Sequence, residues 1–478
     1  MKKIVFLNPP ITAEERYGKL ANIGNALPPL GLTNLAAICI EKGYQVKIID
    51  AEAVKLGYDE TLREIIENNP DYLGITSTTI AIFNAAKIAK MVKEKLPHIK
   101  IIIGGPHLTA LPEMTMQNFT DFDIGVIGEG DITIIELLQS LSNQKKLNEL
   151  KGIIYRDNDV LRKTEQRDLI RDLNSLPKPA YHLLPDLVKY YSAPSHTLKR
   201  HPGTSMITSR GCPSKCTFCA NLFGTKFRGY SAQYIIDIIL WLMNDFGINE
   251  IDIVDDTFVV NKKRVKQICD LLINKNINLS WSCEAKVNFV NPEMLKIMKK
   301  SGCWQIAYGI ETGSQKILDN ISKGTSIKQA RDAIKWTKQA GIQTRGFFMI
   351  GAPGETRETI RETIDFMKEI DLDDFHVTFF TPYPGTPIYN EISKHGKYNE
   401  DWKKLNFWQP VFIPPDLTRE ELIDFQKIIF RKFYFRPKII KRYLLKLLNP
   451  NLREKVLLSF FIFCKFIFSK DSHRSSAP

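Results

Sequence analysis

Short apolar runs alternate with amphipathic stretches through the first third of the chain. Apolar runs bounded by turn residues indicate buried strands, whereas longer stretches with apolar residues three and four positions apart indicate helices. Strands are predicted at Lys3–Leu7, Gln45–Ile49, Tyr72–Ile75, Lys100–Ile103 and Ile124–Ile127. Helices are predicted between them, near Pro29–Lys42, Tyr58–Asn68, Thr79–Lys95 and Ile132–Leu141. The alternation predicts an α/β domain over residues 1–150, with a doubly wound parallel sheet covered on both faces.

A second alternation starts after a connector at residues 151–200. Within the connector, Gly152–Tyr155 and Val160–Lys163 predict a small hairpin, and a proline-punctuated linker follows at Asp172–Pro179. Six further strands are predicted, at Thr204–Ser209, Glu250–Val254, Leu279–Cys283, Gln305–Ile310, Gln343–Ile350 and His376–Thr381. Helices are predicted after them, at Ala232–Phe246, Lys262–Asn274, Pro292–Lys300, Ile327–Ala340 and Arg357–Ile370. These strand–helix steps predict a partial (β/α)6 barrel over residues 201–390, followed by a helical basic region at 391–478.

Polar and glycine-rich residues follow several strands of the first domain. They include Thr76 and Ser77 after the third strand, Gly104 and Gly105 after the fourth, and Gly128 and Glu129 after the fifth. Ligands of open α/β sheets bind at the carboxyl ends of strands, and glycine lets the backbone approach a ligand closely. Simple turn chemistry explains each cluster alone, but their shared position favours a binding site.

Three cysteines lie on the loop after the first barrel strand, at C-x3-C-x2-C spacing: Cys212, Cys216 and Cys219. Thiolates are the usual ligands of iron–sulfur clusters. Three thiolates would bind three irons and leave a fourth open to a substrate. A zinc knuckle or a disulfide pair is the alternative, but zinc prefers four ligands, and no second cysteine pair or histidine is close in the sequence.

Composition adds two limits. A chain of 478 residues with 44% hydrophobic and 25% charged residues is ordinary for a globular protein of two or three domains. The eight cysteines are too few for a secreted disulfide framework, and the start Met1–Pro10 contains too short an apolar run for a signal peptide. We therefore expect a reducing, cytoplasmic location, which also suits an oxygen-sensitive cluster.

The net charge of +13 is concentrated near the carboxyl end. Residues 425–470 contain twelve Lys or Arg and a single acid, Glu454, interleaved with aromatic residues. Such a region can be a helical cap on the barrel, a peripheral contact with the inner face of a membrane, or a nucleic-acid contact, which is the least favoured. Its most apolar stretch, Val456–Phe468, is too short to span a bilayer.

At Cys212–Cys219 the sequence resembles the radical S-adenosylmethionine (radical SAM) family. The resemblance implies a 4Fe–4S cluster on Cys212, Cys216 and Cys219 whose open iron chelates S-adenosyl-L-methionine (SAM). An electron from a flavodoxin- or ferredoxin-type donor then cleaves SAM to a 5′-deoxyadenosyl radical, which abstracts hydrogen from a substrate. Phe218 stands where the family places an aromatic residue near the adenine.

Other SAM-binding residues are expected at the ends of later barrel strands. Asp255 and Asp256 replace the family's glycine-glycine-glutamate and can pair with the SAM amino group. Glu311 can accept hydrogen bonds from the ribose. The run Gly346–Glu355, which includes Ile350, resembles the family's G-x-I-x-G-x-x-x-E stretch and is expected to pack on the adenine. Helix capping or surface charge is the alternative for each acid.

The first domain resembles the cobalamin-binding domain fused to many radical SAM enzymes. The resemblance rests on Pro28–Leu32, Gly104–His107 and Gly128–Asp131, and it implies that cobalamin inserts beside the Thr76–Thr79 and Gly104–Gly105 turns. The D-x-H-x-x-G loop that supplies a cobalt-ligating histidine elsewhere is missing, because no histidine precedes His98.

The combined resemblance implies a cobalamin-dependent radical SAM enzyme that methylates an unactivated carbon, using one SAM to methylate cobalt and a second to form the radical. The substrate is expected to be a small molecule, either lipid-like, a tetrapyrrole or a secondary metabolite. An oxidative cyclase or carbon–carbon coupling enzyme of the same family is the alternative. A non-catalytic sensor with a nucleic-acid-binding tail is the hypothesis from another class.

Overall fold

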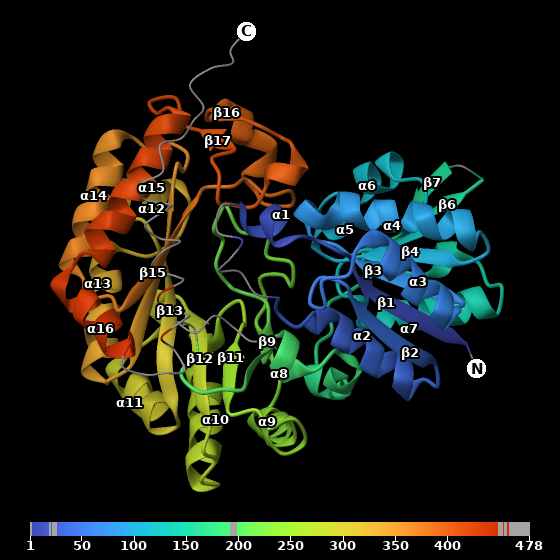
Figure 1. Cartoon of the computed structure of the whole chain (residues 1–478), viewed down its shortest axis with the longest axis horizontal. Coiled ribbons are helices and arrows are strands. Elements are labelled where there is room, and N and C mark those ends of the chain that lie inside the picture. The colour runs from blue at the N-terminus through green and yellow to red at the C-terminus, as the bar shows by residue number, and fades with distance from the viewer. Residues whose placement is uncertain are drawn as a thin grey trace.

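A computed structural model of the chain describes residues 2–18, 21, 26–158, 160–191 and 198–447, together with Arg453 and Leu457. Two α/β halves, each built on its own parallel sheet, lie side by side (Figure 1). The amino-terminal half is blue to cyan, and the second half runs from green to orange. The carboxyl-terminal helices, in red, cover the far side of the second half.

Among the described residues, the first sheet contains seven strands in the order β2-β1-β3-β4-β5-β6-β7. The strands are β1 Lys3–Asn8, β2 Gln45–Asp50, β3 Tyr72–Thr76, β4 Lys100–Gly104, β5 Ile124–Val126, β6 Ile153–Asp157 and β7 Val160–Lys163. The helices are α1 Ala13–Tyr17, α2 Leu30–Glu41, α3 Tyr58–Asn68, α4 Ile82–Lys95, α5 Pro106–Ala110, α6 Pro112–Asn118 and α7 Gly130–Ser142. Alternate residues of β1 are buried on opposite faces, Ile4 and Phe6 with residues of α2 and α7, Val5 and Leu7 with residues of α4.

The five expected strands of this half are confirmed and run parallel. The hairpin expected within the connector also forms, but it pairs antiparallel with β5 and so extends the first sheet. Its apolar residues Ile153, Ile154 and Tyr155 are buried there, which explains why an edge strand rather than a free hairpin forms. The short helices α5 and α6 were not expected, and each begins at a proline in the first helical position.

The second sheet has six parallel strands in the described part of the chain, in the order β15-β14-β13-β12-β11-β8. Its strands are β8 Gly203–Met206, β11 Glu250–Ile253, β12 Ser280–Ala285, β13 Cys303–Glu311, β14 Gln343–Ile350 and β15 Asp374–Phe379. The helices of this half are α9 Ala232–Phe246, α10 Lys262–Asn274, α11 Pro292–Lys300, α12 Gln315–Asn320, α13 Ile327–Gln339 and α14 Arg357–Glu369. The partial (β/α)6 barrel is thus confirmed.

The first barrel strand is shorter than expected. The run Thr204–Ser209 divides into β8 and a separate two-residue strand, β9 Ser209–Arg210, which pairs antiparallel with β10 Arg228–Gly229. The chain turns at Thr208 and Ser209 because both residues bind the buried Asp255 carboxylate. The loop that carries the three cysteines therefore starts and ends on a small ribbon of its own.

Two tyrosines of the connector, which includes α8 Leu187–Tyr190, tie the halves together. The Tyr181 hydroxyl donates to the Ser205 carbonyl of β8 at 2.8 Å. The Tyr191 hydroxyl donates to the Asp50 carboxylate of β2 at 2.7 Å. Both side chains are almost fully buried, so the connector packs as part of the body between the two sheets.

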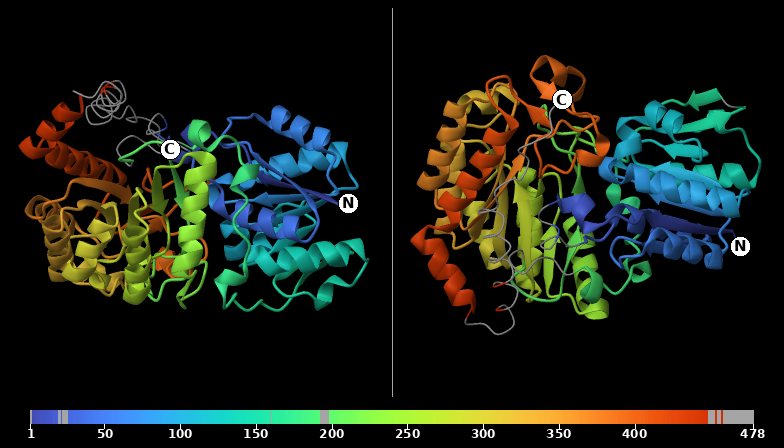
Figure 2. Two further views of the ribbon diagram at one scale, coloured as in Figure 1. Left: turned by 90° about the horizontal axis from the view of Figure 1, so that it is seen from below. Right: turned by 45° about the horizontal axis from the view of Figure 1, so that its top comes forward.

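The described carboxyl-terminal helices pack on the barrel. They are α15 Arg419–Tyr434 and α16 Pro437–Leu447, preceded by a hairpin of β16 Lys397–Tyr398 and β17 Phe412–Ile413. Phe433 of α15 lies 4.3 Å from Phe375 of β15, between ring centroids. Figure 2 shows α15 and α16 along the outer side of the barrel. Of the apolar stretch Val456–Phe468, only Leu457 lies within the described residues, and no helix that the structure describes is long and apolar enough to cross a membrane.

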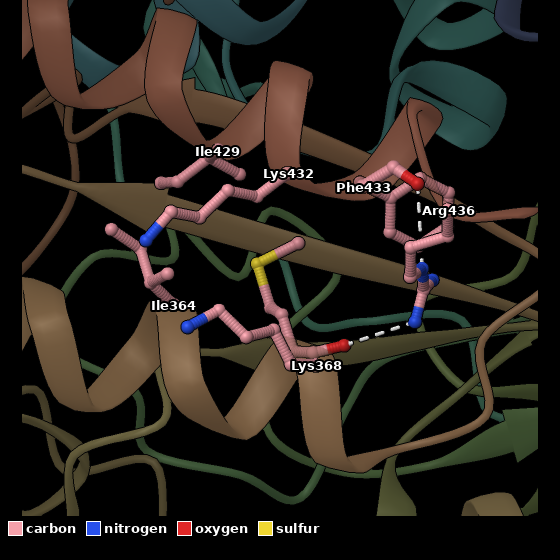
Figure 3. Close-up of a pocket in the computed structure, with 7 residues that line it drawn as sticks. Ile364, Lys368, Ile429, Lys432, Phe433 and Arg436 are labelled. Carbon is pink, nitrogen blue, oxygen red and sulfur yellow. Dashed lines mark hydrogen bonds between the residues drawn. The ribbon is translucent and has the colours of Figure 1, made fainter.

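A shallow groove lies between α14 and α15 (Figure 3). Its floor is apolar and its rim carries three cations; the lining is Ile364, Met367, Lys368, Ile429, Lys432, Phe433 and Arg436. The groove is in the outer helical layer, so the sheet separates it from the residues expected to carry the chemistry.

Candidate active site

The three cysteines lie in the loop between β9 and β10, and each is a free thiol. Cys216 is buried, Cys212 is half-buried and Cys219 is exposed. Burial raises the pKa of both Cys216 and Cys219, and the neighbouring thiols raise these pKa values further. All three thiols lie within one short loop, from Cys212 to Cys219. Lys323 and Lys286 act in the opposite direction and lower the pKa of Cys216.

Within the described residues, no group of three or more His, Cys, Asp or Glu side chains is arranged to hold a single metal ion. The thiolates of an iron–sulfur cluster bind different irons, so their sulfur atoms are spaced more widely than the ligands of one zinc ion. Three thiols in one loop could each bind a different iron of such a cluster.

The backbone at the start of the loop depends on Gly211. Its φ is +89°, a left-handed value that L side chains rarely adopt, and a Cβ there would collide with the Lys226 carbonyl oxygen. The Gly211 amide donates to Asp256 at 3.0 Å, and the Cys212 amide donates to the Gly224 carbonyl at 3.1 Å. The glycine thus lets the two ends of the loop approach closely beside Cys212.

The two expected SAM-binding aspartates have partners within the protein. Asp255 is buried and accepts hydrogen bonds from the backbone amides and hydroxyls of Thr208 and Ser209. Burial raises its pKa, and these bonds oppose that effect. Asp256 accepts from the Gly211 amide, as described above. Both carboxylates therefore fix the polypeptide that leads into the cysteine loop.

Glu311 ends β13 with a φ of +69°, beside an irregularity in the pairing of β13 with β14. Its carboxylate forms a buried ion pair with Lys323. The Lys323 ammonium lies 5.6 Å from the centroid of the Phe218 ring. Burial lowers the pKa of Lys323, but Glu311 outweighs that effect and the net shift is upward. Three groups from separate segments, Phe218, Glu311 and Lys323, therefore meet beside Cys216.

Ile350 is fully buried in the core at the end of β14, and its carbonyl accepts from the Phe380 amide at 2.8 Å. Glu355, five residues on, is also fully buried and accepts from the amides of Gly351 and Ala352. Burial raises the pKa of Glu355 to about 8. The Glu355 carboxylate therefore stabilises the turn after β14 through hydrogen bonds to the backbone of that turn.

The turns at the carboxyl ends of the first sheet lie together. The Ser77 amide donates to the Gly104 carbonyl at 3.1 Å, and a Cβ on Gly105 would lie 2.7 Å from the Thr76 hydroxyl. Gly128 is exposed, and a Cβ there would meet no atom within 4 Å. Thr76, Ser77, Gly104 and Gly105 thus form one compact edge, and Gly128 borders open space beside it.

His107 is not accessible from that space. It is fully buried, with its ring centroid 4.6 Å from that of Trp402, in the segment before β17. Burial lowers the pKa of His107 to about 4. The packing makes His107 part of the contact between the first sheet and the carboxyl-terminal region.

Glu129 joins the two halves. It forms buried ion pairs with Arg228 at 2.8 Å and with Arg210 at 3.3 Å, and Asp131 pairs with Arg210 at 2.8 Å. Glu129 and Asp131 lie at the start of α7, whereas Arg210 and Arg228 are in the ribbon that carries the cysteine loop. The amino-terminal half is thereby fixed to the base of that loop, with Arg210 two residues before Cys212.

Four of these residues were not expected from the sequence: Arg210, Arg228, Lys286 and Lys323. A buried arginine or lysine gives no local signal, since its partner lies far away along the chain. Asp131 belongs to the motif Gly128–Asp131, but its pairing with Arg210 could not be predicted from that motif.

The fold and the loop define a class: a cobalamin-type α/β domain joined to a radical SAM half-barrel. Residues 206–367 match the radical SAM superfamily, and residues 18–138 match the B12 binding domain. An uncharacterized methyltransferase of Pyrococcus horikoshii is 36% identical over 443 residues, which is 92% of this chain and 94% of that protein. The chain therefore belongs to the cobalamin-binding radical SAM family, and it is a radical SAM enzyme.

Two other similarities extend over most of the chain. The anaerobic magnesium-protoporphyrin IX monomethyl ester cyclase of Cereibacter sphaeroides is 26% identical over 478 residues, 96% of this chain and 76% of the cyclase. Among solved structures, OxsB, a cobalamin-dependent S-adenosylmethionine radical enzyme with aqua-cobalamin and S-adenosylmethionine bound, matches with a TM-score of 0.74. That match has 18% identity and covers 97% of this chain and 75% of OxsB; at this identity it supports the fold alone.

Proposed function

We propose that this enzyme is a cobalamin-dependent methyltransferase that acts on an unactivated carbon of a small molecule. The observation that carries the proposal is the ion-pair junction of Glu129, Asp131, Arg210 and Arg228. It connects the half that matches a B12 binding domain directly to the loop of three free thiols. A methyl donor and a radical generator can act on one substrate only if both reach it in the same place, and this junction would hold their proposed sites next to each other.

Cys212, Cys216 and Cys219 are the proposed ligands of a 4Fe–4S cluster. With SAM bound, the cluster would supply a 5′-deoxyadenosyl radical that takes hydrogen from the substrate. The chain prepares the loop in two ways. Lys286 donates to the Ser214 hydroxyl at 2.9 Å, which fixes the middle of the loop. Lys286 and Lys323 also place positive charge near Cys216, and this charge favours the thiolate that a metal requires.

The remaining SAM contacts are proposed in the same place. Phe218 would lie along the adenine and Glu311 would accept from the ribose, since both are grouped around Lys323. Asp255 and Asp256 would act through the backbone of the loop and keep it in shape for the SAM amino group. Ile350 would support the adenine from within the core at the end of β14.

Cobalamin is proposed to bind at the edge formed by Thr76, Ser77, Gly104, Gly105 and Gly128, where it would supply the methyl group. Glycine at 104 and 105 keeps side chains off this part of the edge, and the space beside Gly128 is open. Glu129, expected here as a cobalamin contact, would instead hold this edge against the cysteine loop.

The test uses protein purified without oxygen, loaded with iron, sulfide and cobalamin, and supplied with a chemical reductant and methyl-deuterated SAM. Mass spectrometry then follows 5′-deoxyadenosine, S-adenosylhomocysteine and labelled small molecules in an added metabolite extract. Methyl transfer predicts both nucleoside products and a deuterated methyl group in a product. Formation of 5′-deoxyadenosine without S-adenosylhomocysteine and without label would contradict methylation.

That contrary result would favour the second candidate, an oxidative cyclase or carbon–carbon coupling enzyme. The similarity to the Cereibacter sphaeroides cyclase over 96% of this chain is the observation behind it. The first candidate ranks higher because the methyltransferase of Pyrococcus horikoshii is more similar, at 36% identity.

Three partner assignments belong to this proposal. A flavodoxin- or ferredoxin-type protein would deliver the electron, and the substrate would be a small or lipid-like molecule. The basic region would act first as a cap, because Phe433 of α15 is buried against Phe375. A peripheral membrane contact from a cytoplasmic location would involve the remaining basic side chains, such as Lys438 and Lys441 of α16.

A further inference from the structure

The pairing of the strands shows which residues of the barrel sheet point to its concave face. Tyr308 and Phe375 point to the convex side, where Tyr308 bonds Thr337 of α13 at 2.7 Å and Phe375 packs on α15. Alternate strand residues point to opposite faces, so the neighbours of these residues in the strands point to the concave side. Asp252, Ser282 and Gln305 form one row across β11, β12 and β13. Glu284, Ala307 and Arg345 form the next row, nearer the carboxyl ends.

This face is polar. Closed (β/α)8 barrels fill their interior with branched apolar side chains, whereas here the two rows carry carboxylates, an amide and a guanidinium. Arg345 is paired with Asp374 of β15 at 3.0 Å. Asp252 accepts a hydrogen bond from Ser282 at 2.8 Å. The buried side chains of this face are thus partly satisfied by one another.

Glu284 is the exception. Every other residue of β12 is buried, whereas Glu284 is exposed. No hydrogen bond or ion pair links Glu284 to another described residue. Glu284 is thus an exposed carboxylate without a described partner on the concave face, in the row next to Asp252. The residue opposite it in β13, Ala307, has only a small side chain.

Gln305 lies on the same face of the sheet. Its side chain is 3% exposed, and its amide nitrogen has no hydrogen-bond partner among the described residues. A buried donor left unpaired is destabilising, so this amide is suited to a partner that comes from outside the chain. Glu284 lies diagonally from Gln305 on the neighbouring strand, a spacing that long side chains can bridge.

We propose that Asp252, Glu284 and Gln305 form the substrate-recognition site inside the half-barrel and bind a hydroxyl-bearing part of the substrate. A hydroxyl can donate to the Glu284 carboxylate and accept from the Gln305 amide at the same time. An ammonium group would satisfy the two carboxylates but would leave the amide unpaired, and a carboxylate would be repelled. The inference rests on the proposed function, because it takes the concave face as the place where substrate meets the radical.

The site lies below the cluster loop on the same strand. Lys286, two residues after Glu284 and on the same face of β12, donates to Ser214 between Cys212 and Cys216. Two residues of a strand span about 6.6 Å, so a hydroxyl held at Glu284 places the adjoining carbon atoms toward the cysteine loop. Binding of the substrate hydroxyl at Glu284 would therefore determine which carbon of the substrate faces the radical.

Ligand-detected NMR on the anaerobically reconstituted enzyme tests the inference with three probes of one shape: cis-1,2-cyclohexanediol, cyclohexylammonium and cyclohexanecarboxylate. The diol is expected to bind most tightly. Its affinity should fall at least fivefold in Glu284→Gln and in Gln305→Leu. It should be unchanged in Glu293→Gln, which alters an exposed residue of α11.

Preferred binding of the ammonium or the carboxylate, equal affinity in all variants, or no diol binding at 50 mM would each overturn the inference. Circular dichroism melting identifies a variant that has failed to fold, and in that case Glu284→Asp, which keeps the charge and shortens its reach, replaces it. Diol binding without methyl transfer from SAM would contradict the proposed methylation and leave the recognition site standing. Methyl transfer without diol selectivity would contradict the recognition site and leave the proposed methylation standing.

Discussion

At the scale of single residues, Gly211 controls the shape of the cysteine loop. Gly211→Ala adds a methyl group that collides with the Lys226 carbonyl and forces a left-handed φ on alanine, which costs on the order of 1–3 kcal/mol. We expect the variant to lose most of the iron that the wild-type protein retains after anaerobic reconstitution. Gly247→Ala is the matched control, because Gly247 also has a positive φ, +66°, but open space at its Cβ. Equal iron content in the two variants would contradict the account of the loop.

The buried Glu355 gives a pH-dependent prediction. Its pKa of about 8 in the folded protein exceeds the value of 4.5 for a free side chain. The stability that it contributes is therefore complete below about pH 4.5 and is lost as the pH rises through 8. Glu355→Gln stays neutral throughout, so the stability of wild type relative to this variant should fall by on the order of 4 kcal/mol between pH 5 and 9. Urea unfolding across that range measures it, with Glu293→Gln as the exposed control, and a constant difference would refute the assignment.

The residues that the sequence could reveal were those with a motif around them. Cys212, Cys216 and Cys219 were recognisable from spacing alone, and in the structure they are free thiols of one loop. Lys323 and Arg228 were not recognisable, because their partners Glu311 and Glu129 lie 12 and 99 positions away in the chain. Burial of a charge is decided by tertiary contacts, and a single sequence does not show them.

At the scale of elements, the start of α7 and the ribbon β9–β10 behave as one unit. Asp131→Asn removes the charge that faces Arg210 at 2.8 Å and leaves a buried guanidinium with Glu129 alone. Breaking a buried pair costs about 3–5 kcal/mol when no other partner remains, so we expect about 2 kcal/mol here. Denaturant unfolding and cobalamin retention after gel filtration should both report the loss.

The control for that experiment is the exposed pair of Arg331 and Glu369, which joins α13 to α14. Glu369→Gln should change stability by less than about 1 kcal/mol and leave cobalamin retention unaltered. If Asp131→Asn is as mild as Glu369→Gln in both measurements, the junction does not couple the halves.

Whether a segment forms a helix or a strand was predictable wherever its hydrophobic periodicity was strong. Which strands pair with each other was not predictable. The predicted span Ala232–Phe246 coincides with α9, and Gln343–Ile350 coincides with β14. The same patterns could not show that β6 would join β5, since an apolar strand fits any open edge of a sheet. The division of Thr204–Ser209 was also hidden, because it depends on the distant carboxylate of Asp255.

At the scale of the whole molecule, several buried contacts hold the two α/β halves against each other. The connector tyrosines, the junction of Glu129 with Arg228, and the packing of His107 on Trp402 all fix the amino-terminal half against the barrel. Each half matches a different family, and the buried contacts between the halves join them into one unit. The central claim is that the loop at their contact holds a cluster with one open iron.

Iron content and electron paramagnetic resonance of the reduced, reconstituted protein test this claim most directly. The account predicts about four iron atoms per chain, a cluster signal that changes shape when SAM is added, and loss of both in the variant with Cys212, Cys216 and Cys219 changed to alanine. A triple variant that keeps its iron, or a wild-type cluster signal that does not change when SAM is added, would contradict the presence of a cluster with one open iron.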